Sequence, residues 1–228
     1  MNNGLPFDFV GASLTAMPTG ALWWADEELL VVSDLHLGKS DRIARRTGTM
    51  VPPYEIRDTL LRLQGDLNAT NAKRVICLGD SFDDMAASAN LTDEHRDWIL
   101  TLQAGRKWTW IEGNHDPAPL MLGGQHSKVV TLGPLTFRHI AKVAAMGEVS
   151  GHYHPKLRLN ARGRSIARAC FLFDDTRLML PAYGTYTGGL CLTAPVLQDL
   201  MQPDAQIITI GKTLHHMPMP RVPKRQVG

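Results

Sequence analysis

The stretch LLVVSDLH, residues 29–36, places an acidic residue and a histidine directly after a short apolar run. Residues 29–32 are all aliphatic, and an unbroken aliphatic run of this length predicts a strand that is buried on both faces. Asp34 follows the carboxyl end of this strand, which is the end where parallel α/β sheets bind their ligands. The stretch therefore predicts a parallel strand that carries a carboxylate to a functional site.

The same arrangement recurs twice, in RVICLGD (residues 74–80) and in KWTWIEGNHD (residues 107–116). Between these runs, apolar residues recur every three to four positions over residues 56–67, which predicts an amphipathic helix. A second helix is predicted from about Thr92 to Gln103, with Thr92 or Asn90 as its cap. Alternating strands and helices predict βαβ units with right-handed crossovers.

After Lys128 the sequence changes to short apolar segments separated by turn signals such as Gly133-Pro134. These segments predict a second, more antiparallel sheet packed on the first. The expected fold class is α/β, a four-layer α/β/β/α sandwich of two mixed β-sheets flanked by helices, formed by residues 1–210 as one domain. Residues 211–228 contain three prolines and no acidic residue, and we expect them to form a basic, flexible C-terminal tail.

The composition is that of an ordinary soluble globular protein, with 44% hydrophobic and 20% charged residues in 228. The formal net charge of +2 is too small to indicate a nucleic-acid partner by itself. Cys77, Cys170 and Cys191 lie far apart without a CxxC motif, so neither a disulfide framework nor a thiolate zinc site is expected. No basic leader or long apolar run is visible, and we expect a cytoplasmic protein without membrane association.

Five short polar motifs follow predicted strands or lie among them: SDLHLGK, LGDSFDD, EGNHD, FRHI and SGHYHP. Each alone is weak, because single histidines and aspartates more often cap turns than bind ligands. Together they supply imidazole, carboxylate and amide groups, which are ligands of divalent metal ions. The candidate ligands are Asp34, His36, Asp80, Asn114, His139, His152 and His154.

Seven candidate ligands are more than one ion needs, so the set predicts a binuclear centre. The i, i+2 pairs, Asp34 with His36 and His152 with His154, would share one face of an extended strand. Because no cysteine is among the ligands, we expect two divalent ions of borderline type, with Mn²⁺ first and iron or zinc as alternatives.

Two such ions can hold a hydroxide at neutral pH and orient a phosphoryl group, so phosphodiester hydrolysis by a metal-bound hydroxide is the expected chemistry. His115 points away from Asn114 if the backbone is extended, and it is predicted to protonate the leaving oxygen. Asp116 is predicted to orient His115.

The order D-x-H, G-D, G-N-H-D, H and G-H-x-H resembles the calcineurin-like metallophosphoesterase superfamily. The flanking text LWWADEELLVVSDLHLGKS, LGDSF and LPAYGTYTGGL is similar to the bacterial DNA ligase-associated branch, which is nuclease-like and linked to DNA damage responses. This resemblance covers residues 22–190. It implies one metal among Asp34, His36, Asp80 and His154, and a second among Asp80, Asn114, His139 and His152, with Asp80 as the bridge. It also implies His115 as the transition-state acid and a DNA ligase or helicase as a partner.

Three assignments stay open on the sequence. His139 is favoured over His126 as the isolated histidine ligand, because FRHI is more strand-like than GGQHSK. Asp83 and Asp84 either support the metal ligands or cap a helix. The arginines that follow the G-D and G-N-H motifs of Ser/Thr phosphatases are missing here, which weakens a phosphoprotein-phosphatase function.

Basic residues near the motifs are the only indication of the substrate. They are Lys39, Arg42, Arg45, Arg46, Arg138, Lys156, Arg158, Arg162, Arg164 and Arg168. They either form a solvated surface or line the path of a polynucleotide. Three functions follow: a nuclease acting on DNA or RNA, a hydrolase of small phosphoesters, and a non-catalytic scaffold. The complete ligand set and His115 favour an enzyme.

Overall fold

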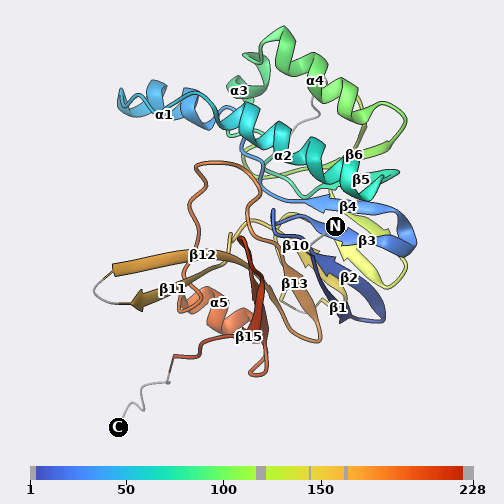
Figure 1. The fold of residues 1–228 in the computed structure, drawn as a ribbon, viewed down its shortest axis with the longest axis vertical. Coiled ribbons are helices and arrows are strands. Elements are labelled where there is room, and N and C mark those ends of the chain that lie inside the picture. The colour runs from blue at the N-terminus through green and yellow to red at the C-terminus, as the bar shows by residue number, and fades with distance from the viewer. Residues whose placement is uncertain (1–3, 117–121, 144, 162–163, 223–228) are drawn as a thin grey trace.

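Two β-sheets stacked face to face, with helices on both outer sides, make up the fold. The computed structural model describes residues 4–116, 122–143, 145–161 and 164–222. In Figure 1 the helices α1–α4 lie on one side of the strands and α5 lies on the other. The predicted four-layer α/β/β/α sandwich is confirmed.

The first sheet has seven strands in the order β1-β2-β3-β4-β5-β6-β7. Their bounds are Leu5–Phe9, Ala12–Ala16, Leu22–Trp24, Leu29–Val32, Arg74–Cys77, Lys107–Ile111 and Gln125–Ser127. Neighbours from β1 to β4 are antiparallel, and neighbours from β4 to β7 are parallel. The three strands predicted from apolar runs are therefore adjacent and parallel, so their carboxyl ends share one edge.

Strand β4 shows why its apolar run is continuous. Leu30 and Val32 pack against the helices, whereas Leu29 and Val31 face the second sheet. All four side chains are buried, and each contributes about 1.5–3 kcal/mol relative to an exposed position. A polar residue on either face of β4 would lie in a core.

Helices α2 (Glu55–Thr70) and α4 (Asp93–Gln103) cover the outer face of the first sheet. The other helices of this half of the chain are η1 (Ala25–Glu27), α1 (Lys39–Thr47) and α3 (Met85–Ala89). Helix α2 buries Leu60, Leu63 and Leu67, as its spacing predicts. Thr92 caps α4, because its hydroxyl accepts the backbone amide of His95 at 3.3 Å.

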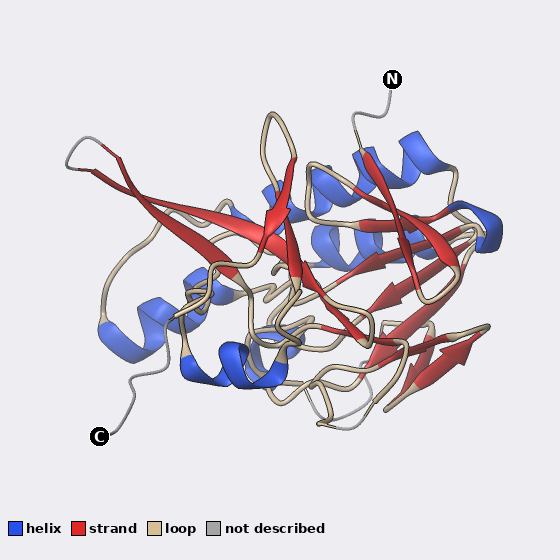
Figure 2. Ribbon diagram, turned by 90° about the horizontal axis from the view of Figure 1, so that it is seen from below, coloured by secondary structure: helices blue, strands red, loops and turns tan. Residues whose placement is uncertain are grey.

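The second sheet runs β15-β14-β12-β13-β10-β9-β8, and β11 pairs with β12 alone. The bounds of β8 to β15 are Val130–Leu132, Leu135–Phe137, Glu148–Ser150, Lys156–Ala161, Arg164–Phe173, Arg177–Met179, Gln206–Thr209 and His215–Pro218. Phe171 faces the first sheet, and Leu172 faces α5 (Pro195–Leu200). Strand β11 and the start of β12 form a hairpin that projects from the body (Figure 1), seen from below in Figure 2.

The expectation of a flexible tail over residues 211–228 is wrong for residues 215–219. Residues 215–218 form β15, which pairs antiparallel with β14, and Met219 is buried beyond it. Prolines are tolerated here because β15 is the last strand of its sheet, where a missing backbone donor costs little. Residues 223–228 lie outside the described part of the chain.

The three cysteines, which all lie within the described residues, are free thiols. None of the helices in the described part of the chain is long and apolar enough to traverse a lipid bilayer.

Candidate metal centre

The candidate ligands come from the ends of strands in both sheets. Asp34 follows β4, Asp80 follows β5 and Asn114 follows β6, so all three lie at the carboxyl edge of the first sheet. His139 follows β9, and His152 and His154 follow β10, in the second sheet. The centre is therefore built where the two stacked sheets meet.

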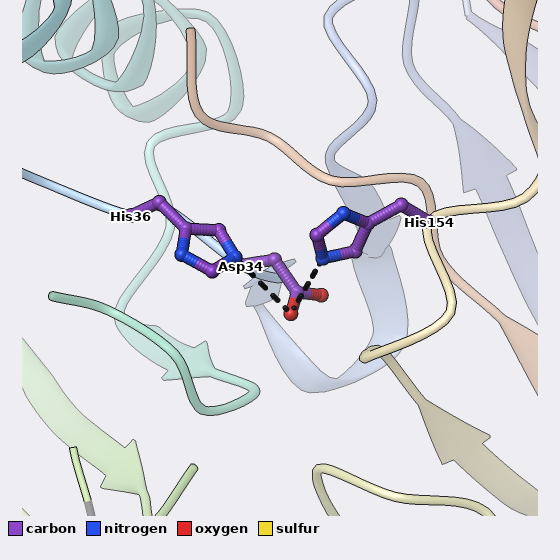
Figure 3. A group of neighbouring side chains, drawn as sticks. All are labelled: Asp34, His36 and His154. Carbon is purple, nitrogen blue, oxygen red and sulfur yellow. Dashed lines mark ion pairs between the residues drawn. The ribbon is translucent and has the colours of Figure 1, made fainter. Parts of the chain in front are cut away.

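Asp34, His36 and His154 form the first ligand set, drawn in Figure 3. The Asp34 Oδ1 atom lies 3.0 Å from His154 Nε2 and 4.0 Å from His36 Nε2. All three of these atoms are buried and lack a hydrogen-bond partner. Buried polar atoms in native proteins are nearly always satisfied, and a divalent cation between them would satisfy all three.

Asp80, His139 and His152 form the second set, and Asn114 completes it. The Nδ1 atom of His139 lies 2.8 Å from the carbonyl oxygen of Leu78, so this nitrogen is the donor and Nε2 carries the lone pair. Nε2 then faces Asn114 Oδ1 at 2.9 Å and Asp80 Oδ2 at 3.3 Å. Converging acceptors of this kind fit a bound cation.

The structure brings all seven candidate ligands together. Asp80 lies between the sets, since its Oδ2 atom is also 4.0 Å from His36 Nε2. This position suits a carboxylate that bridges two ions, and the residues present fit a dimetal centre.

Five of the ligands have a left-handed backbone, a feature that the sequence does not reveal. Their φ angles are 53° for Asp34, 44° for His36, 47° for Asp80, 70° for His152 and 46° for His154. Among the described residues, nine non-glycine positions have positive φ, so more than half belong to the centre. Such conformations cost about 1–3 kcal/mol each and persist where the surroundings impose them.

The expectation of extended i, i+2 pairs is therefore wrong. Asp34 and His36 lie beyond the end of β4, in left-handed turns that are held by the neighbouring loop. The amide of Asp34 donates to the Gly79 carbonyl at 3.2 Å, and the amide of His36 donates to the Asp80 carbonyl at 2.9 Å. These bonds, rather than strand pleating, bring the two side chains together.

Both central carboxylates favour the charged form. Burial raises the pKa of Asp34, but the close contact with His154, the charge of His139 and the hydrogen bond from Ser33 outweigh it and lower the pKa overall. Burial also raises the pKa of Asp80. The hydrogen bond from His139, the charge of His139 and the backbone amide of His115 outweigh this effect and hold the pKa at about 2. Anionic carboxylates surrounded by imidazoles attract divalent cations.

His115 lies at the margin of the centre, with a side chain that is 27% exposed. Its Nδ1 atom is 2.8 Å from the carbonyl oxygen of Asp83, and its Nε2 atom is 3.9 Å from Asp80 Oδ2. The expected pairing of His115 with Asp116 is wrong. The Asp116 carboxylate instead accepts the backbone amides of Ser81, Phe82 and Gly113, because the chain turns it back under the loop after β5.

Asp83 and Asp84, which the sequence left open, have different roles. Asp83 is buried, and its Oδ1 atom lies 2.8 Å from His36 Nδ1. Its carboxylate also contacts Lys39 Nζ at 3.3 Å and Arg42 Nη1 at 3.0 Å. Asp84 caps α3 by accepting the amide of Ala87 at 2.8 Å. The sequence placed Arg42 among the basic residues near the motifs but not at the centre, although its position in the first turn of α1, soon after His36, is consistent with such a place.

His126 lies in β7, opposite Trp110 of β6, although its surroundings GGQHSK are less strand-like than FRHI. Backbone pairing with β6 extends the parallel sheet by a short strand that side-chain pattern alone does not show. His139, and not His126, lies in a ligand set.

Two stacked sheets with clustered acid, amide and imidazole groups at their shared edge define a metallophosphoesterase. The family model of the calcineurin-like phosphoesterases matches residues 28–178, and the chain belongs to this family. It is accordingly a metal-dependent hydrolase, and its family uses a dimetal centre.

A crystal structure of the Pseudomonas putida nuclease MPE is similar to this chain. The identity is 26% and the TM-score is 0.77, over 94% of this chain and 100% of that chain. A comparison with curated protein sequences finds no match.

Proposed function

We propose that this protein is a phosphodiesterase that cleaves nucleic acid, DNA or RNA, with Mn²⁺ as its metal. The observation that carries this proposal is the pair of facing ligand sets with Asp80 between them and His115 at their margin. Two bound divalent ions would activate water, orient the phosphoryl group and stabilise the developing charge. The protein itself supplies the ligands, the proton for the leaving oxygen and the surface for the polymer.

His115 is proposed to give that proton. Its backbone amide donates to Asp80 Oδ1 at 2.8 Å, which fixes the residue against the centre. Its Nδ1–H donates to the Asp83 carbonyl, so Nε2 is the nitrogen that is directed at the substrate. When the bond from phosphorus to the leaving oxygen breaks, Nε2 protonates that oxygen.

Basic residues on two projecting elements support a polymeric substrate. Lys39 and Arg42 lie on α1, and Lys156 and Arg158 lie on β11. Burial lowers the pKa of Lys156, and the charges of Arg158 and Lys39 lower it further. Clustered cations beside a phosphodiesterase centre suit the backbone of a nucleic acid. Arg162 and the side chain of Arg164 lie outside the described residues.

Two parts of the proposal rest on resemblance. The similar protein of Pseudomonas putida is a nuclease by name, which supports nucleic acid as the substrate. The likeness to the DNA ligase-associated branch supports a role in the DNA damage response with a DNA ligase or helicase as partner.

One observation favours hydrolysis of a small nucleotide or other small phosphoester as the second candidate. A cavity of about 440 Å³ opens beside Asn114 and His139, within the roughly 300–1,000 Å³ typical of small-ligand sites. A mononucleotide bound there would place its phosphate near the ligands.

The proposal is tested with bis(p-nitrophenyl) phosphate and Mn²⁺, followed by single-stranded DNA, duplex DNA, RNA and cyclic nucleotides at matched metal. We expect turnover of the chromogenic diester and of at least one polymer. The variant His139→Ala should lose activity, whereas His126→Ala, which removes a histidine outside both ligand sets, should keep it. If the folded protein hydrolyses no diester with any of several divalent ions, the proposal is wrong. Activity on cyclic nucleotides alone would establish the second candidate.

A further inference from the structure

The cavity beside the metal centre has walls of two kinds. On one side it is bounded by Asn114 and His139, which belong to the second ligand set. The rest of its lining includes Lys128, Arg138 and Lys142, together with the apolar side chains of Val129 and Ile140. Any phosphoryl group held at the centre would therefore have this cavity as its immediate neighbour.

The cations of the cavity are only partly neutralised. Arg138 Nε lies 3.0 Å from Glu148 Oε2, and this buried carboxylate also accepts the backbone amide of Lys142 at 2.9 Å. Glu148 therefore holds the arginine and the loop that carries Lys142 in place. Lys128 is 82% exposed and lies 3.9 Å from Glu112, a pairing that is weak at such exposure. The cavity therefore has three cations but only two acids, the buried Glu148 and Glu112 at the rim. This excess of positive charge favours an anionic ligand.

The apolar part of the lining is partly exposed to solvent. Val129 is 40% exposed and Ile140 is 42% exposed, and both belong to loops beside the cations. Aliphatic surface next to ammonium and guanidinium groups suits a ligand that has both a flat apolar part and a phosphate. A nucleotide has this chemistry, whereas a simple phosphate has no use for the apolar wall.

We infer that this cavity is a subsite for the nucleotide next to the cleaved phosphodiester, with Lys128 and Lys142 holding the following phosphate and Ile140 contacting the base. The subsite rests on the proposed function, because it positions a polymer whose scissile phosphate lies at the metal centre. Its occupant is one unit of a polynucleotide chain and not a separate effector.

The test compares two double variants that remove equal charge. Lys128→Ala/Lys142→Ala removes two exposed lysines of the subsite, whereas Lys73→Ala/Lys107→Ala removes two exposed lysines where β5 and β6 begin. That edge is opposite to the metal centre, so the second variant controls for net charge. All four side chains are exposed, and neither variant should disturb the fold.

Binding of a fluorescent thymidylate oligonucleotide is measured by anisotropy in EDTA, which requires no metal and no turnover. We expect the subsite variant to bind roughly 10-fold more weakly or worse for each lost charged contact. Its salt dependence should fall by roughly 0.7 in slope for each contact with a single strand. In Mn²⁺, kcat/KM should fall on the oligonucleotide and stay unchanged on bis(p-nitrophenyl) phosphate, which lacks the following phosphate that Lys128 and Lys142 hold.

Ile140→Ser separates the base contact from the phosphate contacts. It should weaken binding of the thymidylate and leave binding of an abasic oligomer unchanged. If the subsite variant binds and cleaves the oligonucleotide as the control variant does, the subsite is refuted while turnover of the small diester still supports the proposed function. Equal losses in both double variants would also overturn the subsite, because they would show a general effect of charge.

Discussion

Removal of the Asp83 carboxylate should weaken metal binding although Asp83 is not itself a predicted ligand. This carboxylate is 1% exposed, and its Oδ1 atom holds the ring of His36 through Nδ1 at 2.8 Å. Burial raises the pKa of Asp83, but bonds from His36 and Arg42 and the charge of Lys39 hold it well below its usual value. A charged acceptor therefore fixes the tautomer and direction of His36.

The expected loss follows from this geometry. In the variant Asp83→Ala the ring of His36 is free to turn, and loss of such a partner typically costs about 10–100-fold in metal affinity, or about 1.4–2.8 kcal/mol. Lys39 and Arg42 lose their partner too, but their side chains are 20% exposed and can turn toward water. The free energy of unfolding should therefore fall by only about 1–3 kcal/mol.

Calorimetric titration with Mn²⁺ measures the effect directly. Asp83→Asn keeps a neutral acceptor of the same shape, and its affinity should lie between those of the wild type and Asp83→Ala. Asp84→Ala is the matched control: it removes the cap of α3, costs about 1 kcal/mol of stability and leaves Mn²⁺ affinity unchanged. Wild-type affinity in folded Asp83→Ala would refute the role given to this carboxylate.

Three further changes probe the proton donor, a buried carboxylate and a close backbone approach. His115→Ala should lower oligonucleotide cleavage about 100-fold or more with both metals retained, but should slow bis(p-nitrophenyl) phosphate much less, because p-nitrophenolate leaves without a proton. Burial raises the pKa of Asp66 above 3.8, so its charge costs stability as the pH rises through that window; in urea unfolding, Asp66→Asn should become relatively more stable from pH 4 to 7. Gly113→Ala would place a Cβ 2.2 Å from the amide nitrogen and Oδ1 of Asp80, and metal analysis should show loss of bound Mn²⁺.

Each of these three predictions has a result that would contradict it. Equal losses on both substrates in His115→Ala would remove its role as acid. A pH-independent difference between Asp66→Asn and the wild type would show that Asp66 does not titrate as described. For Gly113→Ala the control is Gly65→Ala on the exposed side of α2, where no atom lies within 4 Å and stability should rise by about 0.5–1 kcal/mol. Full metal binding in Gly113→Ala would contradict the close approach.

The sequence predicts the central strands and the ligands because both follow from local pattern. The apolar runs of β4, β5 and β6 are each buried on two faces, and parallel strands necessarily bring their carboxyl ends to one edge. Asp34, Asp80 and Asn114 then meet without any knowledge of the loops. The periodicity of α2 and the cap of α4 are likewise local.

The remaining features depend on contacts between distant segments. The left-handed turns of Asp34 and His36 are imposed by carbonyl groups after β5, some 45 residues along the chain. Asp116 was assigned to His115 because the two are adjacent, yet it is the amides of Ser81 and Phe82 that bind its carboxylate. Strand β15 has the composition of a tail and becomes a strand only because β14 offers it a free edge.

We expect two metal ions to bind where the two sheets meet. Anomalous diffraction from crystals grown with Mn²⁺ would locate them. Two peaks are predicted, one among Asp34, His36 and His154 and one among Asp80, Asn114, His139 and His152. A single peak, or peaks away from these side chains, would contradict the dimetal centre.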